Sequence, residues 1–152
     1  MAKFVYRMQN ILDIKSKLEV QARNEYAQAN AELQEEQEKL SGLVFKKRDC
    51  EDGLRREYDK VPLELLEIEF WKNNISYTEE QIKQQTMKVM SAQKKVEAKR
   101  DAMLELMRDR KTHELLRESA FEEFLQEIKA AESKEIDELV SYTYGKKQNE
   151  SR

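Results

Sequence analysis

Apolar residues recur along this chain at alternating intervals of three and four, in two long segments. In the first segment the seam positions are Ala22, Tyr26, Ala29, Leu33, Glu36, Leu40, Leu43, Lys47, Cys50 and Leu54, and the charged residues Glu36 and Lys47 interrupt this seam and weaken it. The same rhythm begins earlier, at Met8, Ile11, Lys15 and Leu18. Such spacing keeps one seam on one face of an α-helix and is typical of a coiled coil. Two successive steps of four, from Leu18 to Tyr26, predict a stutter in this seam.

The second segment carries a stronger pattern that begins after Pro62, the only proline. Its seam positions are Ile68, Trp71, Ile75, Thr78, Ile82, Gln85, Val89, Ala92, Val96, Lys99, Met103, Leu106, Arg110 and His113. Proline suits the first turn of a helix, where its missing N–H costs nothing, and Gly145 is the first later residue expected to stop the helix.

The two patterns predict an all-α fold, an antiparallel two-helix coiled-coil hairpin with a longer second helix. We expect a single domain (1–152) with helix 1 at about 5–58, a turn at about 59–62, helix 2 at about 63–142 and a frayed polar tail at 143–152.

The predicted helices differ in length, roughly 80 and 120 Å at the rise of an α-helix. Folding back near residue 60 places Phe4 opposite Arg117 and leaves Ser119 to Tyr142 without an intramolecular partner, projecting roughly 40 Å. This overhang carries the apolar residues Phe121, Phe124, Leu125, Ile128, Ile136, Leu139 and Val140. A lone helix would expose that stripe to water, so we expect a partner to cover it.

The composition agrees with a coiled coil and excludes several classes of protein. Charged and apolar residues each make up 39% of the chain, with only three glycines. The net charge of -3 comes from interleaved acids and bases, so the basic footprint of a nucleic-acid-binding protein is missing. We predict a soluble cytoplasmic protein for three reasons. The chain has a single cysteine, no apolar stretch is long enough to span a membrane, and the N-terminus lacks the apolar core of a secretory signal peptide.

The sequence offers little for chemistry. His113 is the only histidine and has no second His or Cys nearby, so we interpret it as structural or surface-exposed. Cys50 lies on a seam and is interpreted as a small buried hydrophobe rather than a reactive thiol. Phosphate loops, nucleophile elbows and zinc spacings are missing, so we predict no enzyme, no catalytic residue, no cofactor and no metal site.

Aromatic residues gather near the predicted turn, where Trp71 is flanked by Phe70 and Tyr77 with Tyr58 across the turn. A two-helix hairpin has too thin a core to bury them all. Two interpretations stay open at this point, an exposed anchor for a partner and packing of the hairpin tip.

Two segments of the chain resemble the flagellar export protein FliJ family. One is the opening run of Phe4, Tyr6, Arg7, Met8, Gln9, Ile11 and Leu12, followed by Lys15 and Leu18. The other is the acidic and basic run from Glu132 to Glu138. The resemblance extends over nearly the whole chain, including its length, its break and its polar tail.

This resemblance implies a soluble component of the flagellar type III export apparatus. Members of the family are antiparallel coiled coils similar in shape to the central stalk of rotary ATPases. They promote assembly of the hexameric export ATPase FliI, contact the export gate protein FlhA, and act as general chaperones or escorts of export chaperones. A monomer is implied, at the cytoplasmic face of the inner membrane and associated with it through the export apparatus.

The resemblance also implies two binding surfaces. At the ATPase end, the paired termini, it points to Phe4, Tyr6, Arg7, Met8, Ile11, Phe121, Phe124 and Ile128. At the export gate it points to Gln37, Leu40, Trp71, Ile75 and Thr78. One turn further on, Ile82 stands where the family has a polar ring, a departure at the edge of the gate surface.

Three other interpretations compete with an export stalk of flagella. One is the equivalent stalk protein of a virulence type III secretion system. Another is a cytoskeletal or scaffold coiled coil that dimerises through the overhang. A membrane-surface helix is disfavoured, because Glu122, Glu123 and Glu127 would be repelled by anionic lipid.

Overall fold

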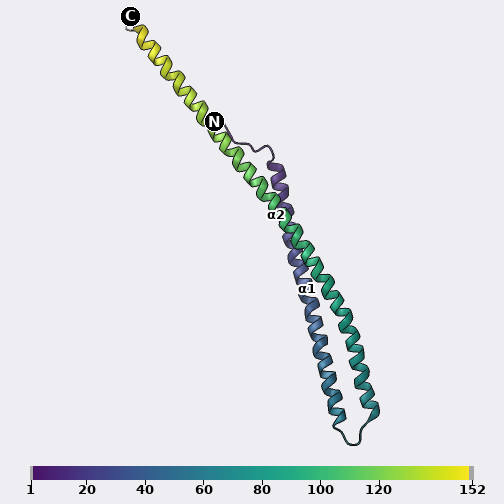
Figure 1. Cartoon of the computed structure of the whole chain (residues 1–152). Coiled ribbons are helices and arrows are strands. Elements are labelled where there is room, and N and C mark those ends of the chain that lie inside the picture. The colour runs from purple at the N-terminus through teal and green to yellow at the C-terminus, as the bar shows by residue number, and fades with distance from the viewer. Residues whose placement is uncertain (1, 151–152) are drawn as a thin grey trace. The chain divides into compact units, whose positions relative to one another are not determined.

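The computed structural model describes residues 2–150 and contains two α-helices over that range, with no strand. Helix α1 spans Gln9–Tyr58 and helix α2 spans Leu65–Glu150 (Figure 1). The predicted all-α helical hairpin is confirmed. Two compact units make up the chain, which we call the hairpin unit (Val20–Glu105) and the terminal unit (Met1–Glu19 with Leu106–Arg152). The prediction of a single domain stays a prediction.

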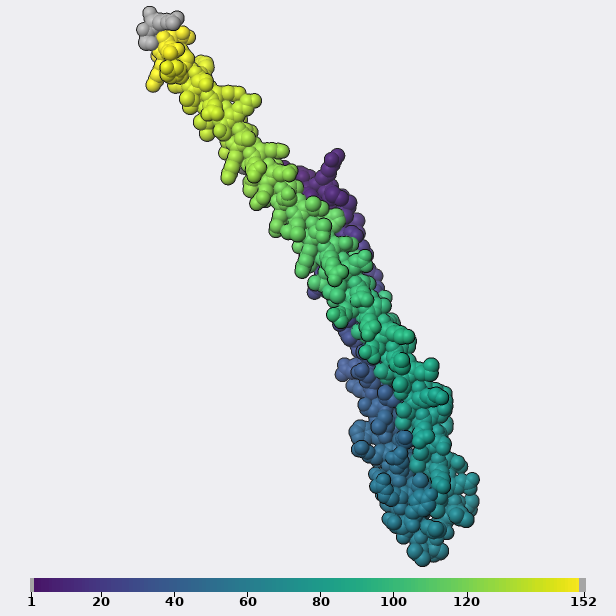
Figure 2. Space-filling view, in the orientation of Figure 1, coloured from purple at the N-terminus to yellow at the C-terminus, as the bar shows by residue number. Residues whose placement is uncertain are grey.

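In the hairpin unit, α1 and α2 lie side by side and are joined by the turn at residues 59–64 (Figures 1 and 2). Ion pairs between the helices join Lys99 to Glu25 (3.1 Å), Lys95 to Glu32 (2.9 Å) and Lys47 to Glu79 (3.3 Å). Residue numbers fall along α2 as they rise along α1, which is the register of an antiparallel pair. These pairs remain partly exposed to water, so each adds little stability by itself.

The seam of each helix follows the predicted spacing. All ten positions predicted between Ala22 and Leu54 are buried or half-buried, and so are all fourteen between Ile68 and His113. Small and polar residues are prominent among the most buried ones, notably Ala22, Ala29, Cys50, Thr78 and Gln85. The core is therefore a thin apolar strip interrupted by polar positions, and those must find hydrogen bonds inside it.

The start of the α1 seam differs from the prediction. Leu18 is exposed, whereas Leu12 and Glu19 are buried, and Glu19 retains only 4% of its surface. Steps of three and four then run from Leu12 through Glu57 without a stutter, so the predicted stutter is wrong. The physical reason is that the Glu19 carboxylate is hydrogen-bonded to Arg110, which lets a charged residue take a core position.

The helix boundaries also differ from those predicted. Helix α1 begins at Gln9 rather than near residue 5. Residues 2–6 are non-helical, and Lys3 to Tyr6 lie against α2 of the terminal unit, where an extended segment places the Phe4 ring on that helix. Helix α2 begins at Leu65, so Pro62 lies in the turn, after a cis peptide bond from Val61, and not in the first helical turn. The longer turn follows from geometry, since the chain must cross about 8–10 Å between two packed helix axes.

The predicted end of the second helix is wrong. Helix α2 passes through Gly145 and continues to Glu150, and Gly145 has no positive φ. A glycine in a helix interior costs about 1 kcal/mol relative to alanine, far less than a proline, and this cost alone does not end a helix. The predicted polar tail is thus helical as far as the structure describes it, and its last two residues lie outside the described range.

Candidate partner-binding surfaces

In the terminal unit, the non-helical N-terminal segment packs against α2 through a cluster of three phenylalanines. The Phe4 ring centroid lies 5.1 Å from that of Phe121 and 5.4 Å from that of Phe124, and those two are 6.5 Å apart. The Arg117 guanidinium carbon lies 5.5 Å from the centroid of the Phe4 ring, within reach of a cation–π interaction. The predicted proximity of Phe4 and Arg117 is confirmed. We call Phe4, Phe121, Phe124 and Arg117 the aromatic cluster.

This cluster corrects the predicted overhang. An extended segment rises about 3.3 Å per residue, roughly twice the rise of a helix, so a few N-terminal residues can lie along several turns of α2. Residues from Lys3 to Met8 share a surface hollow with Ala120, Phe124 and Glu127. The prediction that α2 lacks an intramolecular partner from Ser119 onward is therefore wrong, and continuous exposure begins at Lys129.

Polar contacts hold the same unit together beside the aromatic cluster. The Arg117 Nε donates a hydrogen bond to the Gln9 Oε1 at 2.9 Å, and Lys15 pairs with Asp109 at 3.2 Å. The guanidinium of Arg110 donates both to Glu19 and, at 2.7 Å, to Glu114. These hydrogen bonds, that to Glu19 first, raise the pKa of Arg110, so its positive charge opposes the buried carboxylate at every ordinary pH.

Of the eight residues predicted at the ATPase end, the structure joins Phe4, Phe121 and Phe124 directly. Tyr6 is half-buried beside them, and its hydroxyl has no hydrogen-bond partner among the described residues. The remaining residues of the set are half-buried or exposed in the same unit; they are Arg7, Met8, Ile11 and Ile128. The terminal unit thus presents a mixed aromatic, apolar and basic surface.

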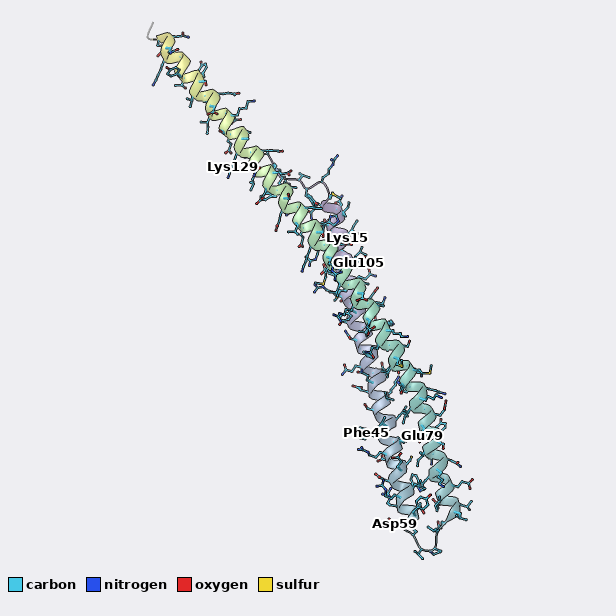
Figure 3. All side chains as sticks on the ribbon, in the orientation of Figure 1. Lys15, Phe45, Asp59, Glu79, Glu105 and Lys129 are labelled. Carbon is cyan, nitrogen blue, oxygen red and sulfur yellow. The ribbon has the colours of Figure 1, made fainter. Side chains whose placement is uncertain are left out.

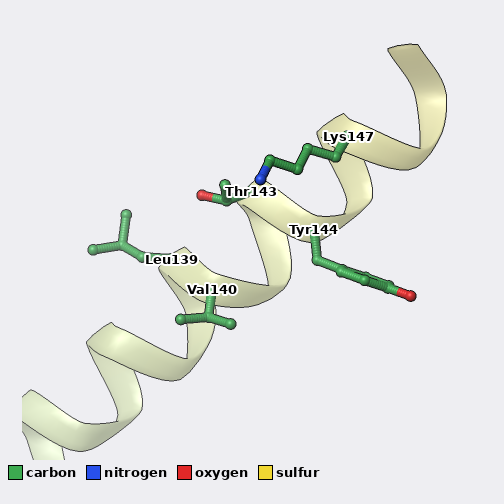
Figure 4. A pocket seen from close by; sticks show the side chains of 5 residues that line it. All are labelled: Leu139, Val140, Thr143, Tyr144 and Lys147. Carbon is green, nitrogen blue, oxygen red and sulfur yellow. The ribbon is translucent and has the colours of Figure 1, made fainter. Parts of the chain in front are cut away.

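Beyond Ile128, α2 keeps an apolar face that no described residue covers. Ile136, Leu139, Val140, Tyr142 and Tyr144 are all exposed. Figure 4 shows Leu139 and Val140 beside each other and Tyr144 one turn further on, where they line a shallow hollow with Thr143 and Lys147. We call Ile136, Leu139, Val140 and Tyr144 the apolar stripe. Sequence reasoning missed Tyr144, because it was assigned to the polar tail, although the spacing of four from Val140 continues the stripe.

In the hairpin unit, Trp71 packs against α1 and still keeps part of its surface accessible. The indole of Trp71 lies over Gly53 of α1, so close that a Cβ added at Gly53 would be 2.8 Å from its ring atoms. Phe70 meets the Trp71 ring edge to face at 5.5 Å. Trp71 is half-buried, whereas Phe70, Tyr77 and Tyr58 are exposed. Trp71 therefore packs the hairpin, and its aromatic neighbours supply the exposed surface.

The five residues predicted to bind the export gate do not form one open surface. Trp71, Ile75 and Leu40 are half-buried, and Gln37 is exposed. Thr78 is fully buried, and its Oγ1 donates to the Asn74 carbonyl oxygen at 2.8 Å. A binding role of Thr78 is limited to supporting its neighbours, since none of its surface is accessible.

Exposed apolar residues near that set were missed by sequence reasoning. Val44 and Phe45 are both more than half exposed on α1, with Phe45 labelled in Figure 3. The helical pattern assigned the adjacent residue Leu43 to the seam and placed Val44 and Phe45 on the solvent-facing side. Such a pattern identifies the buried face but does not consider which apolar residues lie on the other faces.

No group of three His, Cys, Asp or Glu side chains within residues 2–150 is placed to hold a metal ion. Cys50 is buried, as predicted. His113 is half-buried on the α2 seam, and its Nδ1 has no hydrogen-bond partner in the described part of the chain. Neither helix, within the described range, contains a stretch apolar and long enough to cross a membrane.

Comparison with known proteins identifies relatives of this chain. The family described as "Flagellar FliJ protein" matches residues 4–149. A flagellar FliJ protein of Bacillus subtilis (strain 168) is 26% identical over 136 residues, which cover 90% of this chain and 92% of that protein. No solved structure matches the chain significantly.

Proposed function

Since the chain belongs to the FliJ family of flagellar proteins, we propose that it is a coiled-coil stalk of flagellar type III export that binds the hexameric export ATPase FliI and promotes its assembly. Family membership establishes a flagellar, export-related protein. The proposal adds the partner, and it assigns the binding surface to the terminal unit. The chain acts through shape and surface rather than through chemistry.

The observation that carries this proposal is the aromatic cluster together with the apolar stripe. The cluster leaves Phe121 41% exposed although it packs against Phe4. Along α2 from there, the stripe exposes large apolar side chains over about three turns of the helix. Aromatic and arginine side chains dominate the binding energy of protein interfaces, and contiguous exposed apolar surface marks such sites. A protein partner accounts for both features.

We also propose a second contact, with the export gate protein FlhA, through the hairpin unit. Exposed Gln37 and the accessible edges of half-buried Leu40, Trp71 and Ile75 form the contact, with Thr78 as internal support. Escort of export chaperones belongs to the same proposal. The chain then works as a monomer on the cytoplasmic side of the inner membrane, where its partners hold it.

The proposal is tested by titrating the chain into the export ATPase of the same organism with ATP. Hexamer formation and hydrolysis should increase and saturate near about one chain per six ATPase subunits, because a cyclic ring has one central axis. The variant Phe121→Ala with Phe124→Ala should bind more weakly. Met87→Ala with Met90→Ala is the matched control, since both methionines are exposed on α2 in the hairpin unit.

Two results would overturn this function. Unchanged affinity of the double phenylalanine variant would discard the aromatic cluster as the contact. Absence of ATPase binding, combined with concentration-dependent dimers that depend on the apolar stripe, would establish a scaffold coiled coil instead.

A further inference from the structure

Large apolar side chains are exposed at the turn that joins α1 and α2. Val61 retains 97% of its surface, Leu66 82% and Leu65 76%. Leu63, Tyr58 and Phe70 are each more than half exposed. We call these six residues the tip patch. They all lie within the hairpin unit, away in sequence from the aromatic cluster and the apolar stripe.

Packing of the hairpin does not explain the tip patch. The adjacent seam residues Ile68 and Trp71 already fill the space between the helices, with Ile68 buried and Trp71 against Gly53. Leu66 and Phe70 are one turn apart and hence share another face of α2. Turns are normally polar, since loops face water, and contiguous exposed apolar side chains mark an interaction site.

The charges between Asp59 and Glu69 are predominantly negative, and Arg55, Arg56 and Lys72 are the bases that flank this stretch. Between residues 59 and 70 the acids are Asp59, Glu64, Glu67 and Glu69, and Lys60 is the one base. Asp59 is labelled at the turn in Figure 3. Lys60 is engaged within the chain, because its Nζ is 2.9 Å from the Glu57 Oε1. That hydrogen bond first, and then the charge of Glu57, raise the pKa of Lys60; desolvation opposes them, and the charges of Glu64 and Glu67 add to the increase.

We propose that the tip patch is a docking surface for a protein whose apolar pocket is bordered by lysine or arginine side chains. Complementary charge is what selects this occupant, since opposite potentials steer association and like charges oppose it. A second copy of the chain would bring two acidic tips together. An anionic membrane surface would repel the tip for the same reason. This inference goes beyond the proposed function and uses neither the ATPase surface nor the five residues assigned to the gate.

The test expresses the full-length chain, or a variant of it, in a strain of a flagellated bacterium from which the gene for this protein has been deleted. Swimming then depends on the introduced chain. Leu65→Ser with Leu66→Ser removes two exposed apolar side chains, and Met87→Ser with Met90→Ser is the matched control on the same helix. We expect the tip variant to keep its melting temperature and its stimulation of the export ATPase, while swimming in soft agar falls several-fold. The control should swim normally. Retained ATPase stimulation separates a failure at the tip from a failure of the proposed function.

The partner is then identified with benzoylphenylalanine in place of Leu66 as a photo-crosslinking probe in the same cells. The proposal expects an adduct with another protein, mapped by mass spectrometry to a site bordered by basic residues. Glu64→Lys with Glu67→Lys should reduce that adduct at least several-fold. Normal swimming of the tip variant, an adduct between two copies of the chain, or co-sedimentation of the pure chain with phosphatidylserine vesicles through the tip would each overturn the proposal.

Discussion

Replacing Gly53 by alanine should destabilise the hairpin, although alanine is the better helix former. The added Cβ would lie 2.8 Å from two atoms of the Trp71 ring and 2.9 Å from a third, closer than van der Waals contact allows. The indole is rigid and part of the seam, so it must move as a unit. Gly42 is the internal control, because it lies in the same helix and has nothing within 4 Å of an added Cβ.

The two alanine variants should therefore differ in sign. In a helix interior, alanine gains about 0.5–1 kcal/mol over glycine, which is the whole expected effect for Gly42→Ala. Overpacking costs about 1–3 kcal/mol, so Gly53→Ala should lose up to about 2.5 kcal/mol net, with about 1 kcal/mol at the centre of the two ranges. For a chain of this size, each kcal/mol changes the melting temperature by about 2–4 °C. The two variants should consequently melt several degrees apart.

Urea and thermal unfolding, followed by circular dichroism at 222 nm, measure both effects. The decisive comparison repeats Gly53→Ala in a Trp71→Ala background, where the obstructing ring is gone. There the substitution should stabilise by about the 0.5–1 kcal/mol of an open helix position. If Gly53→Ala raises the stability of the otherwise unchanged chain as much as Gly42→Ala does, the close packing of Trp71 on α1 is refuted.

Three further predictions concern single contacts. Arg110→Leu should lower the melting temperature more than Glu19→Leu does, because only Arg110→Leu leaves the buried Glu19 carboxylate without its main partner. The double substitution should recover most of the loss, and equal losses for the two single variants in a thermal melt would contradict this prediction. Phe4→Ala and Phe121→Ala should show a coupling of about 0.5–1.5 kcal/mol in a double-mutant cycle and should speed proteolysis of the N-terminal segment, whereas additive effects would exclude a direct ring contact. Trp71→Ala should cost about 2 kcal/mol in urea unfolding, below the 3–5 of a fully buried tryptophan because this one is half-buried, and should leave the helix content nearly unchanged; a loss near zero would make Trp71 a surface residue.

The seams were predictable because they repeat a local property. Every helix returns to the same face after each three or four residues, so positions such as Ala29 and Ile68 are identified from their own segment alone. The same logic failed at Glu19 and Leu18. Hydrophobicity alone assigns Leu18 to the core in preference to Glu19. A pattern read from one segment does not include Arg110 of the other helix, which hydrogen-bonds the Glu19 carboxylate.

The candidate surfaces were less predictable, since exposure depends on what the partner helix or segment leaves open. Thr78 and Gln37 were assigned to one surface, yet one is fully buried and the other exposed. The tip patch lies outside both seams, and no periodicity draws attention to a leucine in a turn. The sequence drew attention to Tyr58 and Phe70 as aromatic residues, but the exposure of Val61, Leu63, Leu65 and Leu66 beside them is known only from the accessible surface of each side chain.

By itself the sequence determined two long helices, a reversal between them and the faces they bury, since helical periodicity and helix breakers act within a few residues. Only the tertiary structure decided that Phe4 and the segment around it cover the start of the presumed overhang, that Trp71 lies on Gly53, and that a charged Glu19 takes a core position. The physical reason is that each of these outcomes is a contact between residues far apart in the chain. Its free energy depends on the shape and charge of both partners, and neither segment encodes that alone.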